Sequence, residues 1–313
     1  MVGMGSLMST GTLLCESLTK VYGDSKGKKA LDSVSLEVPS HGIFSLIGMN
    51  GAGKTTLVRI LATQLAPTAG RATIDGLDVM PDAKRIREHI ACIPQEARTI
   101  PWMTPKQTVR SYLLWRGMSY DEAGQKASEA LAKVGLEAQE NLLNRRLSGG
   151  TKRKVLVATV LSSDADVIFL DEPTTGLDPI SRQELWTSLT RLAERRFLIL
   201  TTHYLEEAER LANVIGILHR GKLVGLGTLD HLRSTLEYQY SLMVTSDTEL
   251  PVVREGLVTR ASTGQTQILT DESEAYEISR LLLEKGAKFS MSKVSLEDIF
   301  FHLVHRAGQE DSE

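Results

Sequence analysis

The sequence has few of the features that mark secreted, membrane-spanning or nucleic-acid-binding chains. No apolar run approaches the roughly 18 residues that cross a bilayer, and residues 1–10 lack the basic region and long apolar core of a signal peptide. A net charge of −3 gives no general attraction to nucleic acid or to an acidic membrane surface. The only two cysteines, Cys15 and Cys92, form no metal-like cluster and are typical of a reducing compartment. We therefore expect a cytoplasmic chain, with no nucleic-acid partner, that reaches a membrane only through another protein.

The length and the pattern of the chain predict more than one domain. At 313 residues the chain is long enough for about two domains of ~150 residues, and 42% hydrophobic residues is ordinary for a folded protein. We expect residues 1–11 to be a flexible tail and residues 12–228 to form the first domain. Beyond residue 228, short alternating stretches and amphipathic helices carry no catalytic signature, which predicts a small accessory α+β domain over residues 229–313.

A glycine-rich stretch runs from Gly48 to Thr56. It follows the apolar run Ile43–Ile47 and precedes apolar residues at helical spacing, so it is predicted to be a turn between a strand and a helix. Glycines there allow positive φ angles and a close approach of the backbone to a ligand. Backbone N–H groups at the start of the helix then form an anion site. In this P-loop context Lys54 can reach the β- and γ-phosphates of a nucleotide, and the Thr55 hydroxyl can bind Mg²⁺.

Two later apolar runs are typical of parallel strands that are buried on both faces. The first, Val167–Leu170, ends in Asp171 and Glu172, and the second, Leu198–Leu200, ends shortly before His203. Ligands of open α/β sheets gather at the carboxyl ends of the strands. We therefore expect these carboxylates to lie at the ligand site.

Together these motifs resemble the nucleotide-binding subunit of an ATP-binding cassette (ABC) transporter. The glycine-rich stretch matches the Walker A motif, Asp171 ends the Walker B motif, and Leu147–Gly150 matches the start of the signature motif. The Leu-Ser-Gly-Gly tetrapeptide, placed before Walker B and followed by a switch histidine, is far more specific than a P-loop alone. The resemblance covers residues 12–228. It implies an α/β P-loop NTPase fold with a mainly parallel core sheet, an antiparallel β subdomain and a helical subdomain, the last inserted at about residues 96–165.

The resemblance also implies roles for individual residues, with ATP as the nucleotide and Mg²⁺ as its cofactor. Catalysis is assigned to Glu172, His203, Gln95 and Lys54. Nucleotide contacts are assigned to Tyr22, Asn50, Gly51, Gly53, Lys54, Thr55, Thr56, Ser148, Gly149, Gly150 and Asp178. Mg²⁺ is assigned to Thr55, Gln95 and Asp171. Two cassettes, identical or different, are expected to pair head to tail, with each ATP between the P-loop of one and the signature motif of the other.

Three aromatic residues admit two interpretations each. Tyr22, next to Gly23 in a predicted turn, either stacks on the adenine base or covers a sheet edge, and the P-loop downstream favours stacking. Trp102 and Trp115 in the helical insertion either receive a helix of a membrane partner within the region 95–117 or belong to the core of the insertion.

The signature motif departs from the usual pattern of the family. Thr151 stands where glutamine usually follows, and Lys152, Arg153 and Lys154 come next. This form resembles exporters of the drug-resistance and lipid or polysaccharide type, in which the ATPase is commonly a separate chain from the membrane permease. We therefore expect an ATPase subunit that drives export from the cytoplasmic face of the membrane. An iron–sulfur assembly ATPase and an importer subunit remain as alternatives.

Overall fold

The computed structural model describes residues 11–23, 27–245, 259–262 and 265–310. The chain forms two compact units, residues 1–226 and residues 227–313. The expected tail over residues 1–11 lies outside the described residues except for Gly11. Within the described parts of the chain, no helix combines the length and the apolar character that a bilayer span requires.

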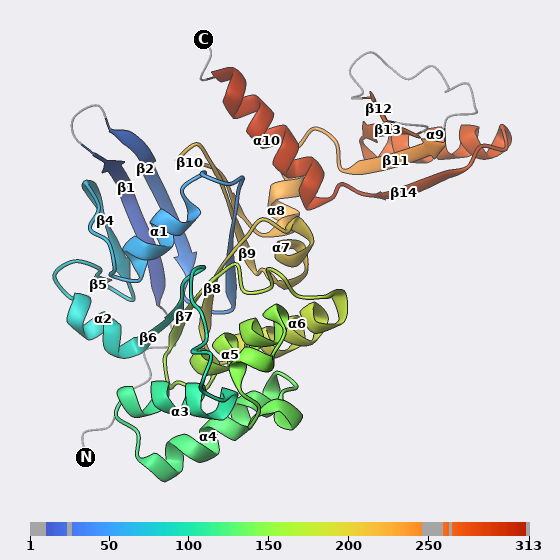
Figure 1. Cartoon of the computed structure of the whole chain (residues 1–313). Helices are drawn as coiled ribbons and strands as arrows, with labels where there is room; N and C mark the ends of the chain where they lie inside the picture. Colours follow the sequence, from blue (N-terminus) through green and yellow to red (C-terminus); the bar gives the residue numbers. More distant parts are fainter. Residues whose placement is uncertain (1–10, 24–26, 246–258, 263–264, 311–313) are drawn as a thin grey trace. The chain divides into compact units, whose positions relative to one another are not determined.

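The first unit contains an antiparallel sheet with the strand order β2-β1-β4-β5 (Figure 1). Its strands are β1 Thr12–Tyr22, β2 Lys28–Pro39, β4 Ala69–Ile74 and β5 Leu77–Asp78. The period-two alternation predicts shorter strands, Thr12–Glu16 and Val34–Val38, with a polar loop that runs from Gly23 to Lys29. These bounds are wrong, because β1 and β2 extend until Tyr22 pairs with Lys28. Register shifts between Cys15 and Val21 interrupt the period-two alternation, so the sequence pattern stops before the strand does.

A second sheet of six strands follows the order β10-β9-β3-β8-β7-β6. Its strands are β3 Ile43–Ile47, β6 Ile90–Ile93, β7 Val167–Asp171, β8 Phe197–Thr202, β9 Val214–His219 and β10 Lys222–Gly227. The five strands from β9 to β6 are parallel. Every residue of β3, β7 and β8 is buried, as their uninterrupted apolar runs predicted. Because these strands are parallel, their carboxyl ends lie at one edge of the sheet.

Helix α1, Lys54–Leu61, lies between the two sheets, and α2, Ala83–His89, precedes β6 (Figure 1). The buried side chains Leu57 and Ile60 share one core with Leu13 of β1 and Phe169 of β7. The apolar spacing of positions 57, 60, 61 and 65 in the sequence predicts a helix that continues to about residue 67. The helix ends earlier because Thr63 has a φ of 59°, a backbone conformation that cannot continue a right-handed helix.

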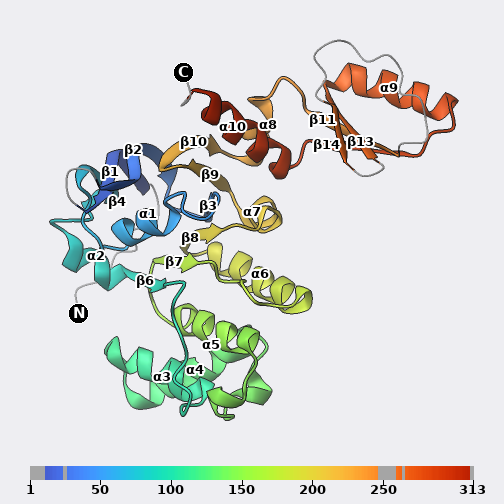
Figure 2. The ribbon, with the colours of Figure 1, turned by 45° about the horizontal axis from the view of Figure 1, so that its top comes forward.

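The remaining helices of this unit belong to a second core on the other face of the parallel sheet. They are α3 Pro105–Trp115, α4 Tyr120–Lys133, α5 Gly149–Leu161, α6 Pro179–Ala193 and α7 Leu205–Leu211, with 3₁₀ turns η1 Glu137–Gln139 and η2 Asn144–Arg146. Helices α3, α4 and α5 contact one another and lie together between β6 and β7 in the chain (Figure 2). Trp102 is 75% exposed and Trp115 is 80% exposed. The interpretation of these tryptophans as core residues is therefore wrong.

The second unit is an α+β fold with the antiparallel strand order β12-β13-β11-β14. Its elements are α8 Leu229–Ser234, β11 Tyr240–Thr245, β12 Thr259–Ser262, β13 Gln265–Thr270, α9 Glu272–Glu284, β14 Phe289–Lys293 and α10 Leu296–Glu310. Its core packs Ile278 and Leu282 of α9 against Leu242 and Ile268 of the sheet. Strand β14 was not predicted, because its alternation covers only five residues and its apolar side chains, Phe289 and Met291, are only half-buried against the core of this unit.

Candidate active site

The P-loop joins β3 to α1 and folds around the ammonium group of Lys54. Gly51 and Gly53 have φ angles of 80° and 108°, and a Cβ on Gly53 would lie 2.4 Å from the carbonyl oxygen of Ala30. Glycine is therefore required at residue 53 for both conformation and space. Nζ of Lys54 donates to the carbonyl oxygens of Gly48 at 2.7 Å and Met49 at 3.2 Å. Burial lowers the pKa of this lysine, and the nearby carboxylates of the site oppose that shift.

The Asp171 side chain joins the P-loop helix to two strands of the parallel sheet. Its Oδ2 accepts a hydrogen bond of 3.2 Å from Oγ1 of Thr55, and its Oδ1 accepts one from Oγ1 of Thr201, the residue that pairs with Asp171 across β7 and β8. A hydroxyl and a carboxylate at this separation are hard oxygen donors of the kind that Mg²⁺ prefers. Thr55 and Asp171 thus fit the Mg²⁺ of a bound MgATP, and Lys54 beside them fits its phosphates.

Glu172 follows Asp171 in a left-handed backbone conformation, with a φ of 50°. Such a conformation costs about 1–3 kcal/mol and persists only where the surroundings fix it. Here the N–H of Glu172 donates to the carbonyl oxygen of Thr201 at 3.1 Å. The turn directs the Glu172 side chain away from the strand and into the site.

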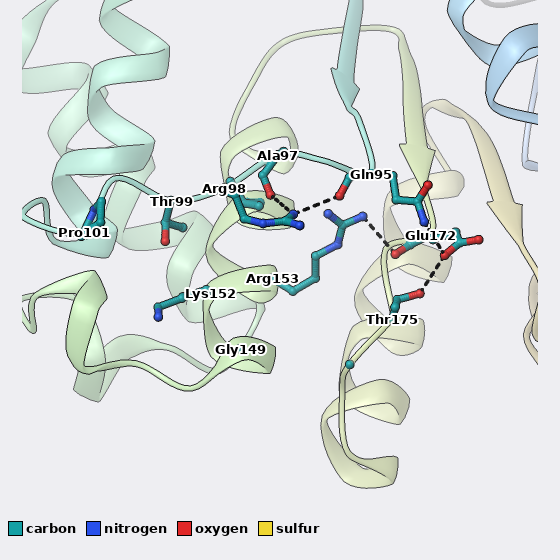
Figure 3. A pocket seen from close by; sticks show the side chains of 12 residues that line it. Gln95, Ala97, Arg98, Thr99, Pro101, Gly149, Lys152, Arg153, Glu172 and Thr175 are labelled. Carbon is teal, nitrogen blue, oxygen red and sulfur yellow. Dashed lines mark hydrogen bonds between the residues drawn. The ribbon is translucent and has the colours of Figure 1, made fainter.

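The Glu172 carboxylate is the point where three chain segments converge. Its Oε2 accepts hydrogen bonds from Nε2 of Gln95 at 3.1 Å and from Oγ1 of Thr175 at 3.2 Å (Figure 3). Its Oε1 lies 3.0 Å from Nδ1 of His203, and because a carboxylate only accepts, Nδ1 carries the proton in this contact. The structure thus brings together the glutamine, the glutamate and the histidine that the sequence assigned to catalysis.

Tyr22 lines the same cavity as the P-loop. The cavity has a volume of about 410 Å³ and is lined by Tyr22, Lys28, Ala30, Asn50, Gly51, Ala52, Gly53, Lys54, Thr55, Thr56, Gln95 and Glu172. The tyrosine ring is 43% exposed, and its hydroxyl lies 3.4 Å from Oγ1 of Thr56. Nζ of Lys20 lies over one face of the ring, 5.5 Å from its centroid. A half-exposed aromatic ring at the rim of a phosphate-binding loop is suited to stacking on a base with its other face.

The signature residues and Asp178 are absent from the lining of that cavity. Exposed Ser148 caps helix α5, and its Oγ accepts a hydrogen bond of 3.1 Å from the N–H of Thr151. The Thr151 hydroxyl lies 2.8 Å from the same Oγ, so the residue that replaces the usual glutamine is engaged locally at the cap. Asp178 caps α6, where the N–H of Ser181 donates to its carboxylate at 3.0 Å and lowers its pKa.

A second cavity of about 570 Å³ lies between helix α5, called here the signature helix, and the turn at residues 172–176 after β7, called here the catalytic turn for its proposed role (Figure 3). Gly149 lines it, together with Gln95 and Glu172, which also line the P-loop cavity. The start of helix α5 and Glu172 therefore line one cavity within the same chain.

Two residues at the site were missed from the sequence alone. Thr201 holds both Asp171 and the backbone of Glu172, but its role follows from the register of β7 and β8, which a linear pattern does not give. Arg153 is buried, and it donates hydrogen bonds to the turn after β7. A basic residue in the predicted helix gives no sequence signal for such burial, because arginine is mostly exposed.

The chain is similar in sequence to known ABC proteins. A family model described as "ABC transporter" matches residues 31–175. The daunorubicin resistance ATP-binding protein DrrA3 of Streptomyces coeruleorubidus is 33% identical, over 95% of this chain and 97% of the relative. The phospholipid-transporting ATPase ABCA3 of Homo sapiens is 32% identical over 96% of this chain, which spans 19% of that longer relative.

Two solved structures have the same fold as the first unit. One is an ATP-binding subunit of an ABC transporter, 27% identical with a TM-score of 0.63, covering 71% of this chain and 92% of that chain. The other is a dimeric ATP-binding cassette in a post-hydrolysis state, bound to ADP and Pi. It is 26% identical with a TM-score of 0.64, and the match covers 69% of this chain and 98% of that chain.

Proposed function

Because this chain belongs to the ABC transporter family as an ATP-binding subunit with ATPase activity, we propose that it binds MgATP at a cassette dimer interface and powers a separate membrane permease. The proposed direction is export, and the proposed place is the cytoplasmic face of the membrane. The observation that carries this proposal is the convergence of Gln95 and His203 on the carboxylate of Glu172, in the cavity that Lys54 also lines.

Different residues of this chain have different roles in the transfer of the γ-phosphoryl group to water. Glu172 accepts a hydrogen bond from the attacking water and serves as general base, a contribution of about 10²–10⁴-fold in rate. Lys54 binds the β- and γ-phosphates. His203, beside Glu172, is placed to hydrogen-bond the γ-phosphate. When bound with ATP and held by Thr55 and Asp171, Mg²⁺ supplies positive charge to the phosphate oxygens.

A second cassette completes the site. Ser148 and Asp178 cap two helices at their N-terminal ends and do not line the cavity of the P-loop. Free N–H groups at the start of a helix bind phosphate, so the start of α5 is suited to the ATP of a partner chain. The similar cassette bound to ADP and Pi is itself dimeric, which supports this arrangement.

The exposed tryptophans support a membrane partner. Trp102 and Trp115 are the two most exposed large hydrophobic side chains among the described residues, and aromatic anchors of this kind are enriched at protein interfaces. Helix α3 ends at Trp115, whose ring lies 6.1 Å from that of Tyr112. The permease is proposed to dock a helix on the region 95–117. The similar proteins are named for daunorubicin resistance and phospholipid transport, which favours an apolar or amphipathic cargo.

The test is copurification from detergent-solubilised membranes. The chain should retain one integral membrane protein in stoichiometric amount, and a variant with both Trp102→Ala and Trp115→Ala should lose that protein while keeping its ATPase activity. Met80→Ala is the matched control, because Met80 is an exposed apolar residue of the same unit. Equal retention by the double variant would contradict the docking region, and the absence of any membrane protein would contradict the permease.

A further inference from the structure

Arg153 is a buried arginine that crosses from the signature helix to the catalytic turn. It lies on α5, just over one turn after the Ser148 cap, and is 8% exposed. Its Nη2 donates hydrogen bonds to the carbonyl oxygen of Asp171 and, at 2.9 Å, to that of Glu172. Its Nε lies 3.4 Å from the carbonyl oxygen of Pro173. Three consecutive carbonyl groups thus receive donors from one side chain.

These contacts complete the support of the left-handed turn. The N–H of Glu172 is held by Thr201 on one side, and its carbonyl is held by Arg153 on the other. Hydrogen bonds from a charged donor are stronger than neutral ones, and a planar guanidinium presents several donors in a fixed geometry. Burial lowers the pKa of Arg153, and the negative charge of Asp171 opposes the shift. All three of these contacts are to backbone carbonyl oxygens, and none is to the side-chain carboxylate of Glu172. The guanidinium group therefore orients the backbone of the turn.

We propose that Arg153 is a positioning residue that fixes the backbone of Glu172 and couples it to the signature helix. This inference rests on the proposed function, in which Glu172 is the general base. Because α5 begins with the residues that face the ATP of the partner cassette, closure of that interface acts through Arg153 on the chain's own catalytic turn. Arg153 itself touches neither the nucleotide nor the attacking water.

The test compares Arg153→Met and Arg153→Lys with the wild-type chain in steady-state ATP hydrolysis and in equilibrium titration with a fluorescent ATP analogue. Arg153→Met removes the donors and keeps an unbranched apolar side chain, and Arg153→Lys keeps the charge with a single donor centre. We expect kcat to fall by about 10–10²-fold for methionine, since a small misplacement of a catalytic group costs that much. Lysine should restore part of the rate, and ATP affinity should stay near the wild-type value in both. Lys152→Met is the control, because Lys152 lines the same cavity from the same helix.

A double-variant comparison separates positioning from general stability. If Arg153 acts through Glu172, adding Arg153→Met to Glu172→Gln should leave the residual rate of the single Glu172→Gln variant almost unchanged. An equal fractional loss in both backgrounds would overturn the inference, as would a wild-type kcat for Arg153→Met. Thermal unfolding shows whether the methionine variant folds. If it does not, kcat and the comparison in the Glu172→Gln background are measured with Arg153→Lys instead, and the same outcomes support or overturn the inference. A wild-type chain without ATPase activity would contradict the proposed function itself, whereas these outcomes leave it intact.

Discussion

Nδ1 of His203 lies 3.0 Å from Oε1 of Glu172, although the two residues are 31 positions apart in the chain. The topology explains this proximity. Strands β8, β7 and β6 are parallel neighbours, and His203, Glu172 and Gln95 each follow the carboxyl end of one of them. The edge of a parallel sheet therefore assembles three catalytic candidates from three distant segments, as expected for a ligand site in an open α/β fold.

Lys54→Ala should weaken ATP binding by at least about tenfold, because a hydrogen bond to a charged group contributes about 1.5–3 kcal/mol. The lysine is the buried cation at the P-loop, and its loss also frees the carbonyl groups of Gly48 and Met49. Titration with a fluorescent ATP analogue measures the affinity. Lys29→Ala is the control, since Lys29 pairs with Asp32 outside the cavity. Unchanged affinity for the Lys54 variant would refute the P-loop assignment.

Tyr22→Ala should weaken ATP binding by about tenfold, and Tyr22→Phe should not. Stacking on a base is worth about 1–3 kcal/mol in nucleic-acid binders, which is an upper guide here. Phenylalanine keeps the ring and removes only the hydroxyl near Thr56. The affinity and the thermal midpoint of each variant are measured together. If alanine lowers the midpoint and leaves the affinity unchanged, the tyrosine has only the structural role of covering the sheet edge.

Glu207→Gln should change how stability depends on pH. Glu207 is fully buried, Nε1 of Trp186 donates to its Oε1 at 2.9 Å, and burial raises the pKa of the carboxyl group. The folded chain therefore holds this proton more tightly than the unfolded chain does. The protonated carboxyl group contributes to the free energy of unfolding below the unfolded pKa of about 4.3, and this contribution is lost as pH rises through the raised folded pKa. Glutamine keeps the acceptor and does not titrate. The thermal midpoint of the variant should therefore rise relative to that of the wild type as pH increases from 5 to 8. A difference in midpoint that stays constant over this range would contradict the prediction.

A chain that ends at Leu226 should fold and bind ATP with nearly the wild-type affinity, because the first unit carries every residue of the P-loop cavity. A cut after Leu236 is worse placed. That shorter chain would retain α8 but lose the rest of the second unit, including the carbonyl group of Val294 to which Arg233 donates. Leu232 of α8, which is buried in the whole chain, would lose the neighbouring elements of its unit. Soluble yield and ATP titration compare the two chains. An insoluble or non-binding chain ending at Leu226 would show that the second unit is needed by the cassette.

The sequence predicted the elements of the fold where pattern and burial agree. The continuous run Val167–Leu170 gave a buried parallel strand, and the apolar spacing after Gly53 gave helix α1. The ends of elements were predicted wrongly where local geometry interrupts the pattern. Examples are the end of β1, beyond its bulges, and the end of α1 before Thr63. Strand β14 was missed because it is five residues long, and its apolar side chains, Phe289 and Met291, are only half-buried against the core.

For the site, the family resemblance named the candidate residues, and the structure supplied their contacts. The sequence placed Gln95 and His203 near the phosphates and gave no sign that both bind the Glu172 carboxylate. Arg153 could not be found from a linear pattern, because its function depends on carbonyl groups of a turn about 20 residues away, which any sequence can present.

The central claim is an ATP-dependent cassette dimer with Glu172 as general base. Glu172→Gln keeps the shape of the side chain and loses the base, so hydrolysis should slow by about 10²–10⁴-fold while ATP still binds. Size-exclusion chromatography with light scattering should then show a monomer without nucleotide and a stable dimer with MgATP. Adding Ser148→Arg should abolish that dimer and leave P-loop binding intact, because exposed Ser148 does not line the chain's own P-loop cavity. A Glu172→Gln chain that stays monomeric at saturating MgATP, or that hydrolyses ATP at the wild-type rate, would contradict the account.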